Sequence, residues 1–154
     1  MAGPSCERYL VRTSSEENKE LVLKAFDTLF NQRDYDAAVA LWSEKYIQHS
    51  AHIAPGREAL FDLVKSLPAE LRYEHGIVVA EKDYVIVHGR FSGTGRPVAW
   101  ISADIVRIEN GKLAEHWDVL QDETLRAGIK KRAADVWRTS PLKKAHPNRI
   151  VPFI

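Results

Sequence analysis

Hydrophobic positions recur at helical spacing in the first half of this chain and alternate with polar positions in the second half. Before Pro68 the helical spacing predicts three amphipathic helices. The first follows a capping serine, Ser14 or Ser15, the second follows Asp34, and the third spans residues 57–67. Residues 46–50 form a short extended piece before the third helix. The apolar residues of the helical faces are Leu21, Val22, Ala25, Phe26, Leu29 and Phe30, then Ala38, Val39, Leu41 and Trp42, then Leu60, Phe61 and Val64.

After Pro68 the hydrophobic period is two, which predicts strands over residues 72–80, 84–91, 97–108 and 113–121. The short turns between these segments favour an antiparallel meander. Helices followed by strands indicate an α+β fold, with the helices packed on one face of the sheet. We expect residues 1–13 to be a loose arm and residues 14–122 to be the folded domain. Residues 123–154 are predicted to be an extension that begins with a helix and packs on the domain or on a partner.

The hairpin around Asn110-Gly111 decides which polar side chains of the sheet can meet, because strand residues alternate between two faces. A two-residue loop would place Asp104 opposite Trp117. A type I turn with Gly111 in a left-handed bulge would instead place Asp104 opposite His116, with Asp118 on the same face. We favour the bulge, which puts these two acids and the imidazole on one face with Val106 and Leu120, and leaves Ile105, Trp117 and Val119 on the other. In the alternative interpretation, the carboxylates only solvate an edge hairpin.

Composition and charge are those of an ordinary globular domain: of 154 residues, 45% are hydrophobic and 28% are charged. The formal net charge of +1 creates no field that would favour nucleic acid or a membrane surface. The single cysteine, Cys6, cannot form an internal disulfide, and no apolar segment is long enough to span a membrane, so we expect a cytoplasmic location. The basic residues within 126–132 and Lys143-Lys144 predict a solvated helix face rather than a nucleic-acid site.

Two sequence motifs carry a family resemblance that extends from about Asn18 to Gln121. They are YIQHSAH, residues 46–52, and ADIVRIENGKLAEHWDV, residues 103–119. With the preceding helices, they resemble the SnoaL-like polyketide cyclases of the nuclear transport factor 2-like superfamily. Within that family the chain is most similar to proteins described as SnoaL-like aldol-condensation-catalysing enzymes. The resemblance implies a cone-shaped, curved antiparallel sheet with three N-terminal helices on its concave face.

The resemblance also implies catalytic residues. In polyketide cyclases of this family an aspartate on the last long strand is the acid/base of an aldol ring closure, and the matching residue here is Asp118. Its partner on the preceding strand is a histidine in some cyclases, whereas this chain has Asp104 there. We expect Asp118 to act as the base, with His116 or a protonated Asp104 as the donor to an enolate oxygen. The residues expected to contact substrate are His49, His88, Trp100, Trp42 and Phe26.

These residues predict a cofactor-independent acid/base enzyme acting on a small or medium apolar carbonyl compound, by aldol-type cyclisation or condensation or by isomerisation. The histidines complete no recognised metal pattern, so we expect no metal; His52 is expected to cap a helix or lie at the surface. The alternative is a non-catalytic ligand-binding or dimerisation domain. Epoxide hydrolysis ranks lower, because it needs an Asp-Arg-Asp relay and Arg107 alternates away from Asp104. We expect a homodimer through the convex sheet face, with Ile105, Trp117 and Val119 as candidate contacts.

Overall fold

The computed structural model describes residues 13–124, which form three α-helices, one π-helical segment and five strands. The helices are α1 (Ser15–Phe26), the π-helix η1 (Asp27–Gln32), α2 (Tyr35–Leu41) and α3 (Arg57–Ser66). The strands are β1 (Trp42–Gln48), β2 (Arg72–Glu81), β3 (Tyr84–Ser92), β4 (Trp100–Glu109) and β5 (Lys112–Asp122). Cys6, the predicted helix of the C-terminal extension and the basic tail lie outside the described residues, as does all but the last residue of the predicted arm.

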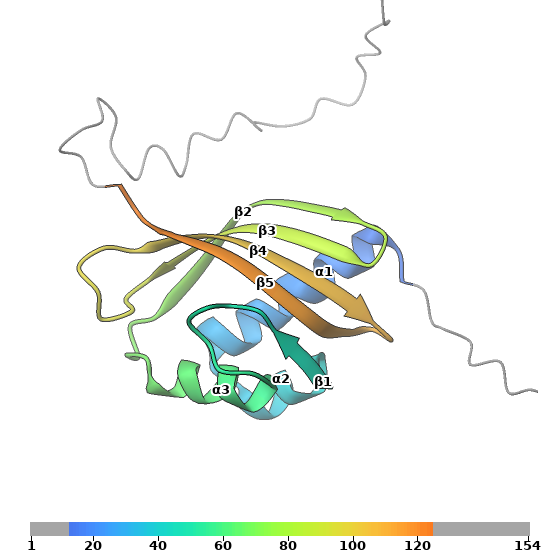
Figure 1. Ribbon diagram of the computed structural model, residues 1–154, viewed down its shortest axis with the longest axis horizontal. Coiled ribbons are helices and arrows are strands. Elements are labelled where there is room, and N and C mark those ends of the chain that lie inside the picture. Colours follow the sequence, from blue (N-terminus) through green and yellow to red (C-terminus); the bar gives the residue numbers. More distant parts are fainter. Residues whose placement is uncertain (1–12, 125–154) are drawn as a thin grey trace, which may run out of the picture. The chain divides into compact units, whose positions relative to one another are not determined.

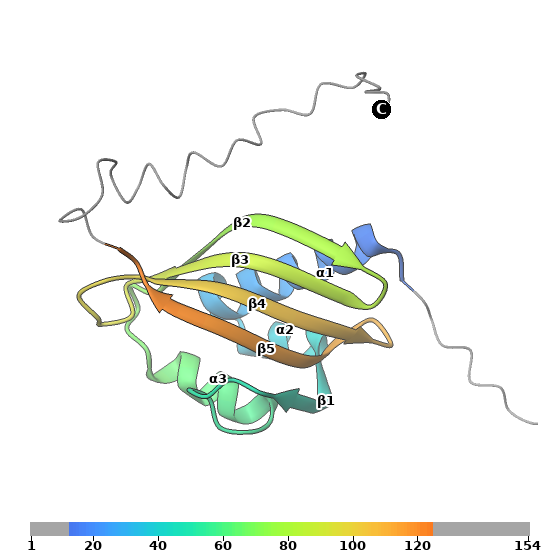
Figure 2. The ribbon, with the colours of Figure 1, turned by 45° about the horizontal axis from the view of Figure 1, so that its top comes forward.

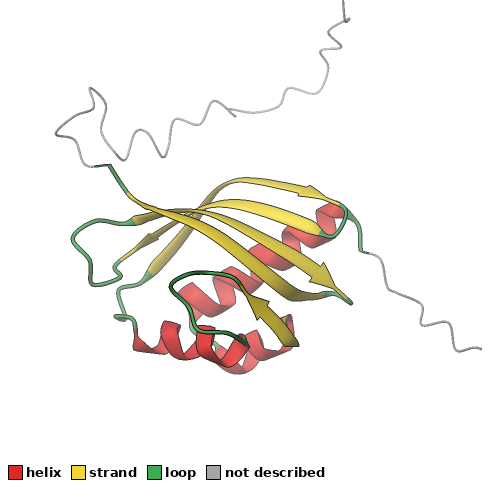
Figure 3. Ribbon diagram, in the orientation of Figure 1, coloured by secondary structure: helices red, strands yellow, loops and turns green. Residues whose placement is uncertain are grey.

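The strands form one curved mixed sheet in the order β1-β5-β4-β3-β2 (Figure 1). The helices are gathered on one side of this sheet (Figures 2 and 3), which confirms the predicted α+β class. Strands β2 to β5 are antiparallel neighbours, whereas β1 runs parallel to β5. The prediction of a purely antiparallel sheet is therefore wrong in one strand. The extended piece around Tyr46 lengthens into β1 because it pairs with the otherwise free edge of β5.

Helix α1 begins with the predicted cap. The Ser14 hydroxyl accepts a hydrogen bond from the Glu17 backbone N–H, and the Glu17 carboxylate accepts one from the Ser14 backbone N–H, which is a capping box. Asp34 caps α2 in the same manner through the Ala37 backbone N–H. This helix is shorter than predicted: it ends at Leu41, and Trp42 has extended backbone angles and begins β1.

The hairpin between β4 and β5 combines a tight turn with a separate bulge. Glu109 pairs with Lys112 across a two-residue turn in which Asn110 and Gly111 have φ angles of 52° and 70°. The pairing then shifts between Arg107 and Ile108, so that Ala114 is an extra residue on β5. The two-residue turn that we ranked second is therefore confirmed, but neither predicted register gave the partner of Asp104, because each considered the turn alone.

The two residues at this bulge, Leu113 and Ala114, are both buried, and the extra residue restores the predicted faces. Asp104 pairs with Asp118, and Val106 pairs with His116, so all four share one face. We call this the inner face, which the helices cover. The opposite, outer face carries Ile105, Trp117 and Val119. The predicted distribution of residues between faces is confirmed although the register is different.

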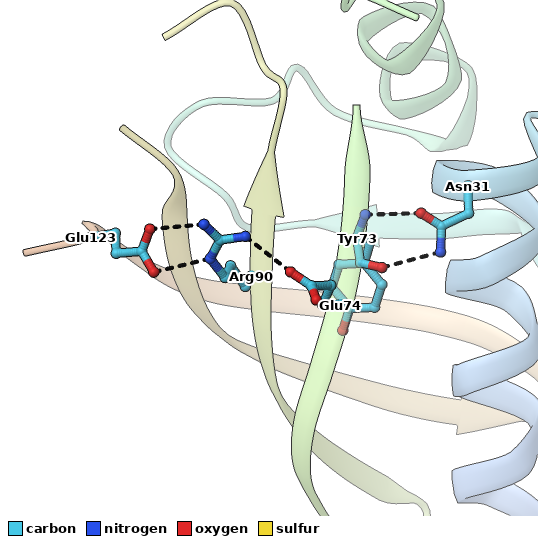
Figure 4. A network of polar contacts seen from close by, with 5 residues as sticks. All are labelled: Asn31, Tyr73, Glu74, Arg90 and Glu123. Atoms are coloured by element: carbon cyan, nitrogen blue, oxygen red, sulfur yellow. Dashed lines mark hydrogen bonds and ion pairs between the residues drawn. The ribbon is translucent and has the colours of Figure 1, made fainter. Parts of the chain in front are cut away.

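Side-chain hydrogen bonds attach the helices to the sheet and the sheet strands to one another (Figure 4). Asn31 of η1 accepts from the Tyr73 backbone N–H at 2.8 Å and donates to the Tyr73 carbonyl at 3.1 Å, which satisfies the edge of β2. Arg90 on β3 binds both carboxylate oxygens of Glu123 and one of Glu74. Arg33, with a φ angle of 55°, donates to three carbonyls at the end of α3. These contacts hold α3 and the sheet in place around the hydrophobic core.

The core lies between the helices and the inner face of the sheet. Its fully buried members include Val22, Leu29, Trp42, Val85, Val87, Val106 and Leu113. Aromatic rings meet edge to face within it, as Phe26 does with Phe30 and with Tyr73. None of the helices in residues 13–124 is both long and apolar enough to cross a membrane.

Candidate functional site

A cavity of about 110 Å³ lies between the inner face of the sheet and the helices. Its walls are mostly apolar: Phe26, Phe30, Tyr46, Ile53, Leu60, Leu63, Val64, Leu67, Leu71, Phe91, Trp100 and Leu120. Its polar lining residues are Ser50, His52, Thr94, Asp104, His116 and Asp118. An apolar pocket with a few convergent polar groups is typical of a small-molecule site. The two central strands β4 and β5 supply three of the titratable side chains.

Asp104 and His116 form a buried pair in the wall of this cavity. The Nε2 atom of His116 lies 3.0 Å from Oδ1 of Asp104, and the two residues are 6% and 3% exposed. The Ser102 hydroxyl donates to the other carboxylate oxygen at 2.6 Å. Both oxygens of Asp104 are therefore bound. The pair is also shielded from water, and polar interactions in such a buried site are stronger than at the surface.

Gln48 of β1 holds the other side of the His116 ring. Its side-chain oxygen lies 2.9 Å from Nδ1 of His116 and accepts the backbone N–H of Ser50 at 3.0 Å. Phe26 packs edge-on against the imidazole, with ring centroids 6.5 Å apart. These contacts come from α1, from β1 and from the loop that follows it. The parallel strand β1 therefore completes the site.

Asp118 lies opposite Asp104 in the β4–β5 ladder and also lines the cavity. Unlike Asp104, its carboxylate makes no hydrogen bond or ion pair with any residue in the described part of the chain. It is only partly buried. A carboxylate without protein partners in an apolar cavity is available to accept a proton from a ligand.

The Tyr46 side chain contributes a neutral hydroxyl group to the cavity wall. Burial raises the pKa of its phenol well above the ordinary value, and the negative charges of Asp104 and Asp118 add to the shift. Burial also raises the pKa of Tyr73, again with a contribution from Asp104. Both phenols therefore stay protonated at neutral pH. The Tyr73 hydroxyl has no hydrogen-bond partner within residues 13–124.

Gly89 on β3 provides the space in which Asp104 and Ser102 meet. A Cβ atom at this position would lie 2.4 Å from Oγ of Ser102, 2.8 Å from Cε2 of Tyr73 and 3.1 Å from Oδ2 of Asp104. The first two distances are shorter than real Cβ contacts allow. Gly89 pairs with Ser102 across the β3–β4 ladder, so the missing side chain lies directly under the Ser102–Asp104 hydrogen bond.

Five residues predicted for the site do line the cavity. Asp104, His116 and Asp118 face it from the sheet, Phe26 faces it from the end of α1, and Trp100 lies in its wall at the start of β4. Trp42 does not line it. This residue is 1% exposed and packs edge-on against Phe61, with ring centroids 5.5 Å apart, because it begins β1 on the core side.

His49 and His88 were predicted as pocket residues, and the structure corrects both positions. His49 is exposed: its ring stacks on Trp117 at 4.8 Å, and Nε2 lies 2.9 Å from Glu115, on the outer face. His88 is exposed and pairs with Ala103, also on the outer face. Strand alternation explains both corrections, because the neighbouring residues Gln48 and Gly89 have the inward positions.

The sequence interpretation missed several residues of the site, mainly on and after β1. Tyr46, Gln48 and Ser50 are buried and alternate with exposed Ile47 and His49. Alternation separates His49 from Gln48, but apolar Ile47 shares the exposed face with His49, so the hydrophobic pattern did not show which face is inward. His52, expected at the surface or in a cap, lines the cavity near Trp100, with ring centroids 6.4 Å apart.

Several solved structures share the fold of this chain. A candidate hydroxylase, AclR from Streptomyces galilaeus, is 26% identical, with a TM-score of 0.57 over 70% of this chain and 91% of that one. A candidate ketosteroid isomerase from Kribbella flavida is 13% identical, with a TM-score of 0.62 over 92% of this chain and 98% of that one. An epoxide hydrolase from M. tuberculosis is 12% identical, with a TM-score of 0.57 over 70% and 84%. The last two likenesses show the fold alone.

The search of curated proteins finds no match. The SnoaL-like domain model matches residues 22–116, which include the end of α1, all of β1 to β4 and the part of β5 that carries His116. This match covers more than half of the chain and contains both Asp104 and His116. The chain therefore belongs to the SnoaL-like domain family.

Proposed function

We propose that this protein is a cofactor-independent acid/base enzyme that acts on a small apolar carbonyl compound. The observation that supports this most directly is the contrast between two facing carboxylates in one apolar cavity. Asp104 is bound by His116 and Ser102, whereas Asp118 has no polar partner among residues 13–124. One carboxylate is thus committed to a protein network, and the other is free to react with a ligand.

In the proposed reaction Asp118 removes a proton from the carbon next to the substrate carbonyl. The electron pair of the broken C–H bond is delocalised onto the carbonyl oxygen, and the resulting enolate oxygen shares the proton that lies between Nε2 of His116 and Asp104. The enolate carbon then attacks a second carbonyl in an aldol closure, or it is reprotonated at another position in an isomerisation. The Tyr46 hydroxyl, which burial keeps protonated, is a further donor in the same wall.

The size and lining of the cavity favour a compact ligand. A dry cavity of about 150 Å³ holds one benzene ring, and the cavity here measures about 110 Å³. We therefore propose a substrate with one ring or a short branched chain. Charged substrates are disfavoured, because the titratable lining residues lie among a dozen apolar side chains.

Two alternatives make different use of the cavity. As a passive binding domain, the protein would hold the same apolar ligand without turning it over. Epoxide hydrolysis through an Asp-Arg-Asp relay has less support, because no arginine of residues 13–124 lines the cavity. Arg90 is bound by Glu74 and Glu123, and Arg107 is bound by Glu115.

For the assembly we propose a homodimer formed through the outer face of the sheet. Large hydrophobic side chains are exposed there: Val79, Tyr84, Ile86 and Val119 are 51%, 45%, 42% and 68% exposed. A contiguous exposed apolar patch on an otherwise polar surface is typical of a protein interface.

A cytoplasmic location stays a prediction from the sequence.

Proton exchange tests the proposed chemistry without knowledge of the final product. The protein is mixed in D₂O with a panel of single-ring and short-chain ketones, and deuterium incorporation beside the carbonyl is measured by NMR. We expect catalysed exchange for the wild type and a loss of about 100- to 10,000-fold for Asp118→Asn. The control is Asp62→Asn, which alters an exposed acid on α3. Ligand binding without exchange would support the passive binding domain instead, and full activity of Asp118→Asn would remove this residue from the mechanism.

A further inference from the structure

The hydrogen bonds around Gln48 determine where the protons of His116 lie. The side-chain oxygen of Gln48 accepts the Ser50 backbone N–H at 3.0 Å. A backbone N–H can only donate, so the Gln48 amide must present its oxygen, not its nitrogen, at this point. The amide nitrogen is directed instead to the Tyr46 hydroxyl, 3.4 Å away. The orientation of the amide is therefore set by the backbone.

The same oxygen lies 2.9 Å from Nδ1 of His116. An unprotonated Nδ1 would bring two lone pairs together at that distance, so Nδ1 must carry a proton and donate it to Gln48. The neutral tautomer with its proton on Nε2 is excluded unless the amide turns over. Turning it over would set the amide NH₂ against the Ser50 N–H, in a site that is 8–9% exposed at Gln48 and Ser50.

With Nδ1 protonated, Nε2 and the facing carboxylate share a single proton across 3.0 Å. It belongs either to an imidazolium beside a carboxylate or to a neutral imidazole beside a carboxylic acid. The Asp104–His116 pair has no net charge in either case. The pair therefore adds no net negative charge to the inner wall beside Asp118.

We propose that Gln48 is a positioning residue that keeps a proton on Nδ1 of His116, so that the His116–Asp104 pair faces the substrate oxygen without net charge while Asp118 acts as the base. Its importance for turnover rests on the proposed function, whereas the protonation state of His116 does not. Without Gln48, His116 can adopt the Nε2–H tautomer and donate to an ionised Asp104. The wall would then hold two facing carboxylates, and the His116–Asp104 pair would carry one proton fewer and a net negative charge beside the substrate oxygen.

The test is a spectroscopic measurement on the full chain labelled with ¹⁵N-histidine. Long-range ¹H–¹⁵N correlation spectra report which ring nitrogen is protonated, and the His116 signals are assigned by their loss in His116→Gln. We expect a protonated Nδ1 in the wild type at neutral pH. An unprotonated Nδ1 in the wild type would overturn the proposal.

Two substitutions separate the effect of the Gln48–His116 hydrogen bond from the effect of side-chain packing at residue 48. Gln48→Leu removes the acceptor, and we expect a switch to the Nε2–H tautomer with at least a roughly tenfold loss of ketone exchange, since a wrong histidine tautomer disables proton transfer. Gln48→Glu keeps an acceptor oxygen and should retain the Nδ1 proton. Gln121→Leu, at an exposed position of β5, is the matched control and should change neither signal.

The outcomes distinguish this proposal from the proposed function. Retention of the Nδ1 proton in Gln48→Leu would show that Gln48 does not hold it. A tautomer switch with unchanged exchange would overturn the role in catalysis while Asp118→Asn still tests the base. If no ketone exchanges in the wild type but the tautomer behaves as expected, the proposed function fails and the assignment of the proton to Nδ1 by Gln48 stands.

Discussion

Asp104 and Asp118 lie directly opposite each other across the β4–β5 ladder, yet their surroundings differ completely. Asp104 is 3% exposed and is bound by Ser102 and His116, whereas Asp118 has no polar partner within residues 13–124. Two like charges at such a position would repel each other. The contacts of Ser102 and His116 with Asp104 offset part of that repulsion.

This difference predicts unequal effects of the same substitution on the free energy of unfolding. Asp104→Ala leaves the buried Ser102 hydroxyl and the His116 imidazole without their acceptor, and it should lower the free energy of unfolding by about 1–3 kcal/mol. Asp118→Ala removes no hydrogen bond and should change that free energy by roughly 0.5 kcal/mol or less. Urea unfolding measures both. Equal losses in the two variants would contradict the assignment of Asp104 to the protein network.

Gly89→Ala should destabilise the protein by about 1–3 kcal/mol, because the added methyl group overlaps Ser102 and Tyr73. The nearest atom is the Ser102 hydroxyl oxygen, at 2.4 Å. Introducing Gly89→Ala into a Ser102→Ala background should therefore cost less than it does in the wild type. A double-mutant cycle measured by urea unfolding gives this difference. If the free-energy changes of the two substitutions simply add, the overlap between the added methyl group and the Ser102 hydroxyl is relieved in another way.

Glu115, on the outer face of the sheet, makes the free energy of unfolding depend on pH. Hydrogen bonds from Arg107 and then from His49 hold the pKa of Glu115 below its ordinary value. A carboxyl group whose pKa is lower in the folded state stabilises the fold above its unfolded pKa, about 4.3, and this contribution is lost as the pH falls through the folded value. The free energy of unfolding should thus decrease below about pH 4.5, and it should decrease less steeply in Glu115→Gln.

The measurement for this prediction is urea unfolding at several pH values between neutral and acidic. Glu44→Gln is the control, because Glu44 is an exposed residue of β1. The side chain of Glu115 is 18% exposed, so solvent weakens the effect and only the change of slope is predicted. A slope in Glu115→Gln that matches the wild type would show that these hydrogen bonds contribute nothing to acid stability.

The proposed homodimer predicts that Val119→Glu gives a monomer. Val119 is 68% exposed on the outer face, and a charge there would have to be buried against the partner. Light scattering at micromolar concentration should detect a dimer for the wild type and a monomer for the variant. Val39→Glu is the control, because Val39 is 42% exposed on α2 and not on the sheet. A monomeric wild type would remove the dimer from the proposal.

Local patterns in the sequence were sufficient for most elements. Ser14 and Asp34 cap the helices as expected, because a capping hydroxyl or carboxylate acts on backbone groups only three residues away. Strand alternation placed His116 and Asp118 on one face of β5, whereas their meeting with Asp104 was predicted from a register that the structure does not have. Trp42 was assigned to a helix because its apolar side chain fits either a helical face or a strand.

The sequence by itself determined the α+β class, the strand pattern and the alternation of faces along each strand, since these depend on neighbouring residues. Tertiary structure decided the parallel pairing of β1 with β5, and with it the contact between Gln48 and His116, which are separated by 68 positions. It also decided the register, because the bulge at Ala114 lies outside the turn that the sequence marks. Contacts between distant segments depend on how the whole core packs, and no local pattern encodes that.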